Sequence, residues 1–190
     1  MDARLLLLAL LCSAAAHAGG PAVINSSTID NSGAGYQGNF GLNQAAGDQQ
    51  QQANTRAIAI GANGQASAQV RQRVVTSAAR DMAARAVIGG DSFSSGDGAL
   101  GVNQSAGAGN QQVNVMRISV GAGPQSVDDS VLSQQNVTLS QSSGSGNGAI
   151  GSREVGISDQ AFAGSRGVVQ LNQSAGVGNR MGNTLSIRVE

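Results

Sequence analysis

The chain has 190 residues, a formal net charge of zero from eleven basic and eleven acidic side chains, and aromatic residues at only 2% of its positions. The balanced charge provides no field that would attract nucleic acid or an anionic lipid surface, and the shortage of large apolar residues disfavours a conventional globular core. The abundance of Gly, Ser, Ala, Asn and Gln, with β-branched residues between them, is typical of a chain that becomes ordered by stacking.

Residues 1–18 have the pattern of a secretory signal peptide. Arg4 precedes the apolar run Leu5–Leu11, and Ala16-His17-Ala18 provides the small residues that signal peptidase recognises. The apolar run is much shorter than the roughly 20 residues that cross a bilayer. We therefore expect cleavage near Ala18/Gly19 and a secreted mature protein that becomes part of an extracellular fibre.

Removal of this segment would also remove reactive side chains. Cys12 and His17 are the only cysteine and histidine of the chain, and the chain contains no lysine. The mature protein would then lack the thiol, the imidazole and the amine that most often act in catalysis or bind metals. We expect no disulfide, no cofactor, no metal and no enzymatic activity.

Residues 19–37 are expected to form an N-terminal leader, in which Ser26–Gly35 shows no repeat character. Gly33–Gly38 matches the G-x-G-x-x-G fingerprint of dinucleotide-binding proteins, but the preceding strand, the following helix and the acidic residue that such a site needs are not indicated. Because the chain contains 28 glycines, such a match arises easily by accident, and we interpret it as a loop.

One sequence unit then occurs three times, at 38–60, 98–120 and 167–190. Each copy reads Gly-x-apolar-x-apolar-Asn-Gln, continues through Ala-Gly to a further Asn, and ends in Ile-x-Ile or Ile-x-Val. Apolar residues two positions apart predict β-strands, and the glycines between them predict a reversal, so each copy should be a strand, a turn and a strand. The expected apolar strand positions are Phe40, Leu42, Ile58, Ile60, Leu100, Val102, Ile118, Val120, Val169, Leu171, Ile187 and Val189.

Stacking the three copies would place identical amide side chains above one another. A lone two-stranded unit is marginal in water, whereas stacked units can bury their apolar faces on each other. Asn and Gln both donate and accept hydrogen bonds, so the shared amides would form ladders with a repeat of about 4.7 Å along the stack. The expected ladder and turn residues are Asn43, Gln44, Gly47, Asn54, Asn103, Gln104, Gly107, Asn114, Asn172, Gln173, Gly176 and Asn183.

The linkers at 61–97 and 121–166 differ from the repeats and from each other. In the first, Val74–Val87 has apolar positions near helical spacing, although Val70–Thr76 could equally be a strand, so both interpretations stay open. In the second, Val131–Leu139 is strand-like, and Ser142–Gly148 is rich in Gly and Ser, which indicates a flexible stretch.

Charged residues suggest two weaker alternatives. A glycosidase would need paired carboxylates, and the close acidic residues are Asp128, Asp129, Glu154 and Asp159, but they lie in the second linker and not in the repeats. Arginines in or beside the repeat strands are better explained by an outward face that keeps the monomer soluble than by a binding patch; they are Arg117, Arg180 and Arg188.

The three repeats, with their [GQ]-[LV]-N-Q-[AS]-A-G cores and Asn/Gln-rich linkers, resemble the Fap functional amyloid family of Pseudomonas (FapB/FapC type) over essentially the whole chain. The short length and the lack of a C-terminal Cys-x-x-Cys are most similar to the minor, nucleating subunit of that family. The resemblance implies self-assembly, co-assembly with a major, FapC-like amyloid subunit, export through a dedicated outer-membrane pore, and a role in the biofilm matrix and in adhesion.

The sequence therefore predicts an all-β fold, with three stacked strand-turn-strand repeats in a β-solenoid-like, cross-β core and partly flexible linkers. We expect a minor, nucleating subunit of a secreted functional amyloid fibre. The alternatives are the major structural subunit of the same fibre, a monomeric secreted β-solenoid adhesin and, last, a hydrolase.

Overall fold

The structure, a computed structural model, describes residues 23–62, 64–76, 82–121, 133–139 and 151–189. The described residues form eleven β-strands and no helix. No helix among them is long and apolar enough to cross a membrane. The expected signal peptide, the whole of the expected flexible stretch at 142–148, and the acidic pair Asp128 and Asp129 lie outside the described residues.

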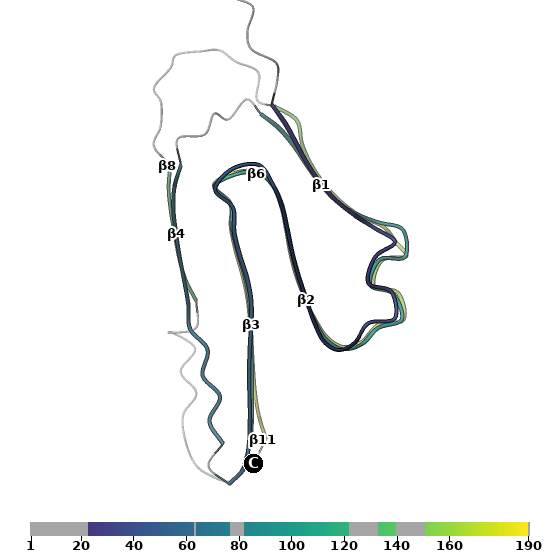
Figure 1. The fold of residues 1–190 in the computed structure, drawn as a ribbon, viewed down its shortest axis with the longest axis vertical. Coiled ribbons are helices and arrows are strands. Elements are labelled where there is room, and N and C mark those ends of the chain that lie inside the picture. Colours follow the sequence, from purple (N-terminus) through teal and green to yellow (C-terminus); the bar gives the residue numbers. More distant parts are fainter. Residues whose placement is uncertain (1–22, 63, 77–81, 122–132, 140–150, 190) are drawn as a thin grey trace, which may run out of the picture.

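The strands fall into three successive layers. The first layer consists of β1 (Ile24–Asp30), β2 (Gln37–Ala46), β3 (Gln51–Ile60) and β4 (Val70–Thr76). The second consists of β5 (Ala83–Gly89), β6 (Asp97–Ala108), β7 (Gln111–Val120) and β8 (Ser133–Leu139), and the third of β9 (Arg153–Ile157), β10 (Arg166–Val177) and β11 (Arg180–Val189). Viewed along the stack, the layers superimpose almost completely (Figure 1).

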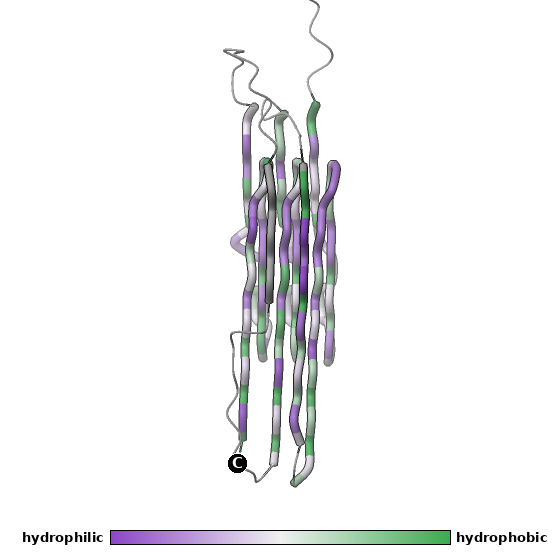
Figure 2. The backbone as a smooth tube through the Cα atoms, turned by 90° about the vertical axis from the view of Figure 1, so that its left-hand side faces the viewer, coloured by the Kyte–Doolittle hydropathy of each residue, from purple (hydrophilic) through white to green (hydrophobic). Residues whose placement is uncertain are grey.

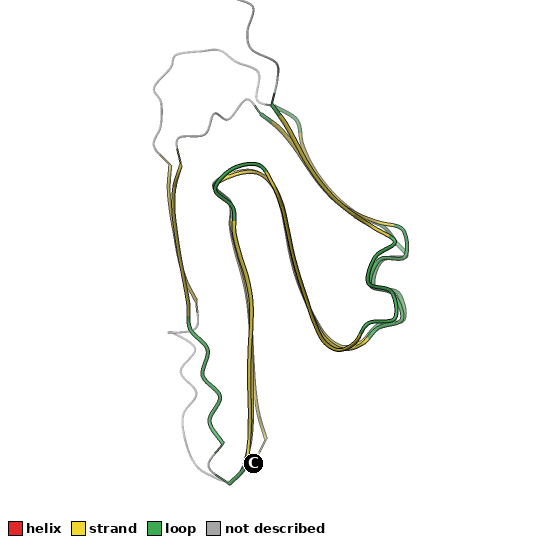
Figure 3. Ribbon diagram, in the orientation of Figure 1, coloured by secondary structure: helices red, strands yellow, loops and turns green. Residues whose placement is uncertain are grey.

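Each strand pairs in parallel with the equivalent strand of the neighbouring layer. The sheet orders are β1-β5-β9, β2-β6-β10, β3-β7-β11 and β4-β8. Seen from the side, the strands run next to one another with polar and apolar residues alternating along them (Figure 2). Figure 3 shows that the turns of the three layers also coincide. The prediction of an all-β, β-solenoid-like stack is confirmed.

The apolar core lies between the first and the second sheet, where the first strand of each layer packs on the second. Its buried members are Ile29, Tyr36, Ile88, Phe93, Leu100 and Val102. The turn between these two strands adds aromatic contacts, since the Phe93 ring lies 5.3 Å from the Phe162 ring and 6.3 Å from the Phe40 ring. A second, smaller cluster around Val113 and Val115 lies on the other side of the stack, against Ala68 and Val70.

The first strand of each layer corrects the expectation that Ser26–Gly35 lacks repeat character. Ile24–Asp30 is a strand, and it lies in register with Ala83–Gly89 of the next layer. The only side chain that all three copies share in this sheet is the isoleucine of the column Ile29, Ile88 and Ile157. The repeating unit therefore begins one strand earlier than the 38–60 repeat.

The described part of the first linker forms strands and not a helix. Val70–Thr76 is β4 and Ala83–Gly89 is β5, with residues 77–81 outside the described part, so the helical interpretation of Val74–Val87 is wrong for the residues that the structure describes. In the second linker, the strand-like segment contains β8, which pairs with β4 in parallel. The linkers thus contribute a fourth sheet of two strands.

Candidate assembly site: the stacked amide side chains

The register of the second sheet brings the repeated Asn-Gln pairs together. Asn43 pairs with Asn103 and Asn103 with Asn172, and the glutamines that follow them are aligned in the same way. The third sheet aligns Asn54, Asn114 and Asn183. Because neighbouring residues of a strand point to opposite faces, the asparagines of the second sheet face the third sheet and the glutamines face the first.

The asparagine side chains form two continuous ladders. In the second sheet, Asn103 Nδ2 donates to Asn43 Oδ1 at 2.9 Å, and Asn172 Nδ2 donates to Asn103 Oδ1 at 3.0 Å. In the third sheet, Asn114 Nδ2 donates to Asn54 Oδ1 at 2.9 Å, and Asn183 Nδ2 donates to Asn114 Oδ1 at 3.0 Å. Each step joins residues 60 or 69 positions apart in sequence.

The two asparagine ladders are also joined to each other. Asn114 Nδ2 lies 3.1 Å from Asn103 Oδ1 within the second layer, and Asn172 Nδ2 lies 3.1 Å from Asn114 Oδ1 across layers. Apart from Asn43, each ladder asparagine also donates to a backbone carbonyl of the other sheet, as Asn114 Nδ2 does to Val102 O at 3.1 Å. The polar interior of the strand-turn-strand unit is therefore a connected network whose groups largely satisfy each other.

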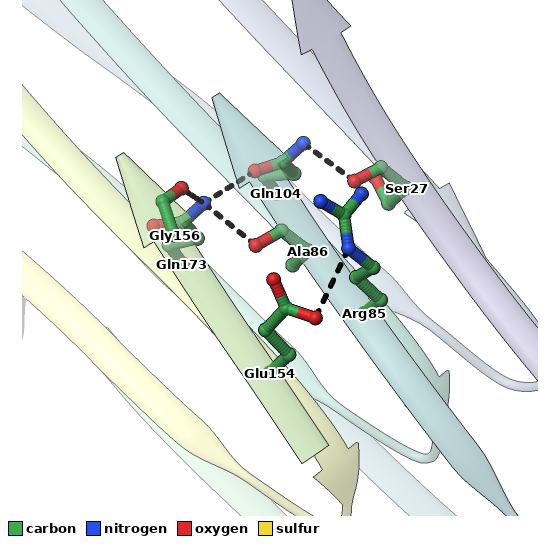
Figure 4. Close-up of polar contacts among 7 residues, drawn as sticks. All are labelled: Ser27, Arg85, Ala86, Gln104, Glu154, Gly156 and Gln173. Carbon is green, nitrogen blue, oxygen red and sulfur yellow. Dashed lines mark hydrogen bonds and ion pairs between the residues drawn. The ribbon is translucent and has the colours of Figure 1, made fainter. Parts of the chain in front are cut away.

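The glutamine ladder lies on the opposite face and connects the second sheet to the first. Gln104 Nε2 donates to Gln44 Oε1 at 3.1 Å. Gln173 Nε2 donates to Gln104 Oε1 at 2.8 Å, as Figure 4 shows. The same nitrogens reach backbone carbonyls of the first sheet. Gln44 Nε2 donates to Thr28 O, Gln104 Nε2 to Val87 O at 2.9 Å, and Gln173 Nε2 to Gly156 O at 3.0 Å.

Burial makes these hydrogen bonds matter for stability. Asn103 and Gln104 in the middle layer are fully buried, and Asn172 is 2% exposed. A buried amide that loses its partner keeps the desolvation penalty, which is about 1–3 kcal/mol. Asn43, in the first layer, is exposed. The ladders therefore favour the in-register arrangement most strongly where a layer is covered on both sides.

Further amides near the turn between the second and third strands extend the network. Gln52 Nε2 donates to Gln112 Oε1 at 2.9 Å, in the direction opposite to the asparagine ladders. Gln111 Nε2 donates to Gln51 Oε1 at 3.0 Å, and Asn179 Nδ2 donates to Asn110 Oδ1 at 2.9 Å. These residues are not among the expected ladder residues, although Gln51-Gln52 and Gln111-Gln112 repeat at the same offset as Asn43 and Asn103.

The repeated turn glycines lie where neighbouring layers approach most closely. Gly107 has a φ of 113°, and a Cβ on it would overlap the carbonyl oxygen of Gly176 in the next layer. Gly47 has the same relation to Gly107. Glycine is needed in this column both for the left-handed backbone and for the spacing between layers.

The apolar strand positions divide into two groups. Leu100 and Val102 are fully buried, and Phe40, Leu42 and Leu171 pack against them. Large exposed fractions are found instead at Ile58 (60%), Ile60 (78%), Val169 (42%) and Val189 (49%). The remaining positions, Ile118, Val120 and Ile187, are half-buried. The Ile-x-Ile and Ile-x-Val ends align in register across the three layers, but their side chains stay exposed or half-buried and do not form a core.

The charged residues do not gather into a catalytic arrangement within the described part of the chain. Glu154 forms an exposed ion pair with Arg85, at 3.1 Å between Oε2 and Nε, and Asp159 lies in the turn after β9. The described residues contain no group of three or more His, Cys, Asp and Glu side chains that could hold a metal ion. Burial lowers the pKa of Arg56, whose Nη2 donates to Phe40 O at 2.9 Å inside the first layer.

Comparison with known proteins gives one family. A family model described as "Functional amyloid protein FapB/FapC family" matches residues 12–190. No solved structure matches the chain. The match extends over the strands of all three layers and over both linkers.

Proposed function

Because this chain belongs to the FapB/FapC family of functional amyloid proteins, we propose that it is the nucleating, FapB-like subunit of a secreted amyloid fibre. In this role the mature chain, starting near Gly19, is exported and promotes polymerisation of a major, FapC-like subunit. The fibre then contributes to the biofilm matrix and to adhesion.

The observation that supports this proposal is the stacking of identical amides inside a single chain. Starting a cross-β stack is slow because strands must lose conformational entropy before they gain contacts with neighbours. Here three layers are covalently joined, and the middle layer has both neighbours from the start, with Asn103 and Gln104 fully buried. One chain can therefore provide a small stack onto which further repeat layers add.

A seeding experiment tests the proposal. Purified mature chain, added in trace amounts to a major subunit with the same repeat, should abolish the lag phase of its polymerisation. A variant with Asn43, Asn103 and Asn172 all replaced by Ala is the matched control, and it should leave the lag unchanged. An unchanged lag with the wild-type chain would instead favour the role of a bulk structural subunit.

Fibre diffraction separates the amyloid role from that of a monomeric adhesin. Assembled mature chain should give reflections near 4.7 Å along the fibre and near 10 Å across it, about the spacings of paired strands and packed sheets. A protein that stays a folded monomer at all concentrations tested would contradict the proposal and support the adhesin.

A further inference from the structure

The two ends of the three-layer stack differ in shape. In the first layer Asn43 is exposed, whereas Asn172, its counterpart in the third layer, is only 2% exposed. The third layer also contains a shallow hollow lined by residues of β10 and β11 alone, among them Gln170, Leu171, Asn183 and Leu185. In the ladder through Asn103, the end amide is therefore exposed at the first layer and covered at the third.

The two ends also differ in hydrogen-bonding character. In the ladders through Asn103, Gln104 and Asn114, every Nδ2 or Nε2 donates to the amide oxygen of the layer before it. Among the described residues, Asn43 takes part in its ladder as an acceptor, from Asn54 and Asn103, so its Nδ2 hydrogens are still available to donate. Gln44 Nε2 donates one hydrogen to Thr28 O and keeps the second, so Asn43 and Gln44 both present amide donors at the first-layer end.

The third layer presents the matching acceptor. Gln173 is 9% exposed, and its Oε1 is buried and accepts no hydrogen bond from the described residues. The nitrogen of the same amide is held by Gln104 Oε1, Ala86 O and Gly156 O, at 2.8, 3.1 and 3.0 Å (Figure 4). Three hydrogen bonds fix this nitrogen toward the second layer and the first sheet, so the oxygen of the amide is left for a donor beyond the third layer.

We infer that the third-layer end is the growing face of the stack and that it receives the first layer of a second copy of this chain. Gln44 of the incoming copy would donate from Nε2 to Gln173 Oε1, and its Asn43 would enter the hollow between β10 and β11. This repeats the contact that Gln104 makes with Gln44 inside the chain. Growth is polar because, among the described ladder residues, a buried acceptor without a hydrogen-bond donor is found at the third-layer end and not at the first.

This inference rests on the proposed function, and two proline variants test it separately. Gln111 N donates to Asn179 O of the third layer, and alternate residues of a parallel strand bond to opposite neighbours. The N–H of Val115, four residues after Gln111, therefore also points toward the third layer. Thr184 is in register with Val115, so its N–H points the same way, which is away from the second layer. Ala83 N donates to Val23 O, so by the same alternation the N–H of Ser26, in register with Arg85, points away from the stack at the first layer.

Thr184→Pro therefore blocks the third-layer face, and Ser26→Pro blocks the first-layer face, without removing a hydrogen bond between layers. Both residues are exposed and carry a hydroxyl, which makes the pair well matched. Each variant is added in substoichiometric amounts to wild-type chain growing from fluorescent wild-type seeds. Hydrogen exchange at β6 and β7 verifies that the middle layer of each variant is folded. If Thr184→Pro loses this protection, Ser186→Pro repeats the test, because the N–H of Ser186 points the same way as that of Thr184.

Thr184→Pro should join a growing tip through its intact first layer and then stop elongation, whereas Ser26→Pro should leave elongation from the same tips at the wild-type rate. The reverse result, or equal effects of the two variants, would overturn the inference while leaving the amyloid role intact. Absence of elongation with wild-type chain alone would instead count against the proposed function itself.

Discussion

Asn103 donates from Nδ2 to Asn43 Oδ1 at 2.9 Å, although the two residues are 60 positions apart in sequence, and they occupy the same place in successive layers. The contact requires parallel strands in exact alignment, because a shift of one residue would turn the asparagine to the other face of the sheet. The side-chain ladder thus specifies the register that the backbone hydrogen bonds alone would leave open.

Replacing Asn103 with Ala should destabilise the mature chain by about 1–3 kcal/mol, because the buried amides of Asn172 and Asn114 then lose a partner. The free energy of unfolding from urea titration measures this. Asn39→Ala is the control, since Asn39 is exposed, lies outside the ladders, and is in register with Ala99 of the second layer. Equal effects of the two substitutions would show that the ladder adds no stability.

Gln104→Met should loosen the first sheet selectively. It removes the hydrogen bonds to Ser27 O and Val87 O but keeps the volume of the side chain. Backbone amides of β1 and β5 should exchange faster with deuterium, while those of β7 stay protected. Gln112→Met is the control, because Gln112 bonds within the second layer to Gln104 O and across to Ser174, and its loss should affect β6 and β7 instead.

Gly107→Ala should prevent the layers from closing at the turn, since the new Cβ would overlap the Gly176 carbonyl and the backbone would stay in a left-handed conformation. We expect a loss greater than the roughly 1–3 kcal/mol of backbone strain alone. Gly38→Ala has a comparable φ of 74° but meets nothing within 4 Å, so it isolates the strain. Similar denaturation midpoints for both variants would contradict the close approach of the layers.

Phe93→Ala should be among the most damaging single substitutions, at about 3–5 kcal/mol, because Phe93 is fully buried between Phe40 and Phe162. Phe162 is half-buried, so Phe162→Ala should cost less. Chemical denaturation of the two variants side by side measures the difference. A larger loss for Phe162→Ala than for Phe93→Ala would contradict the placement of Phe93 at the centre of the aromatic cluster.

Glu154→Gln should change the free energy of unfolding by less than about 1 kcal/mol, since the Glu154–Arg85 ion pair is exposed. The same variant tests the hydrolase alternative. If the wild-type chain hydrolyses polysaccharide and Glu154→Gln does not, the Glu154 carboxylate has a catalytic role and does not serve only as the partner of Arg85.

The sequence predicted the second and third strands of each layer because their side chains take part in interlayer recognition. Period-two apolar residues and the repeated Asn-Gln pair are visible in all three copies, as in Leu42-Asn43-Gln44 and Val102-Asn103-Gln104. These are the segments where a substitution changes the contact between layers, so their similarity can be read directly from the residues.

The first strand could not be recognised in the same way, because the contact that it makes with the glutamine ladder in all three layers is through its backbone. Gln44, Gln104 and Gln173 bond to the carbonyl oxygens of Thr28, Val87 and Gly156, which are three unrelated residue types in one column. Two weak signals do exist. Ile29, Ile88 and Ile157 are aligned, and in the second and third layers a Phe follows five residues later.

The in-register stacking of the three repeats is tested most directly by paired spin labels. Asn39→Cys and Ala99→Cys place labels on residues that are in register, about 4.8 Å apart across parallel strands, in a mature chain whose own Cys12 has been removed with residues 1–18. Doubly labelled chain, diluted into unlabelled chain so that only labels within one molecule interact, should show strong spin exchange. The pair Asn39→Cys and Thr184→Cys, which lie in different layers and sheets, should not. Absence of exchange between positions 39 and 99 in assembled material would contradict the stacked arrangement.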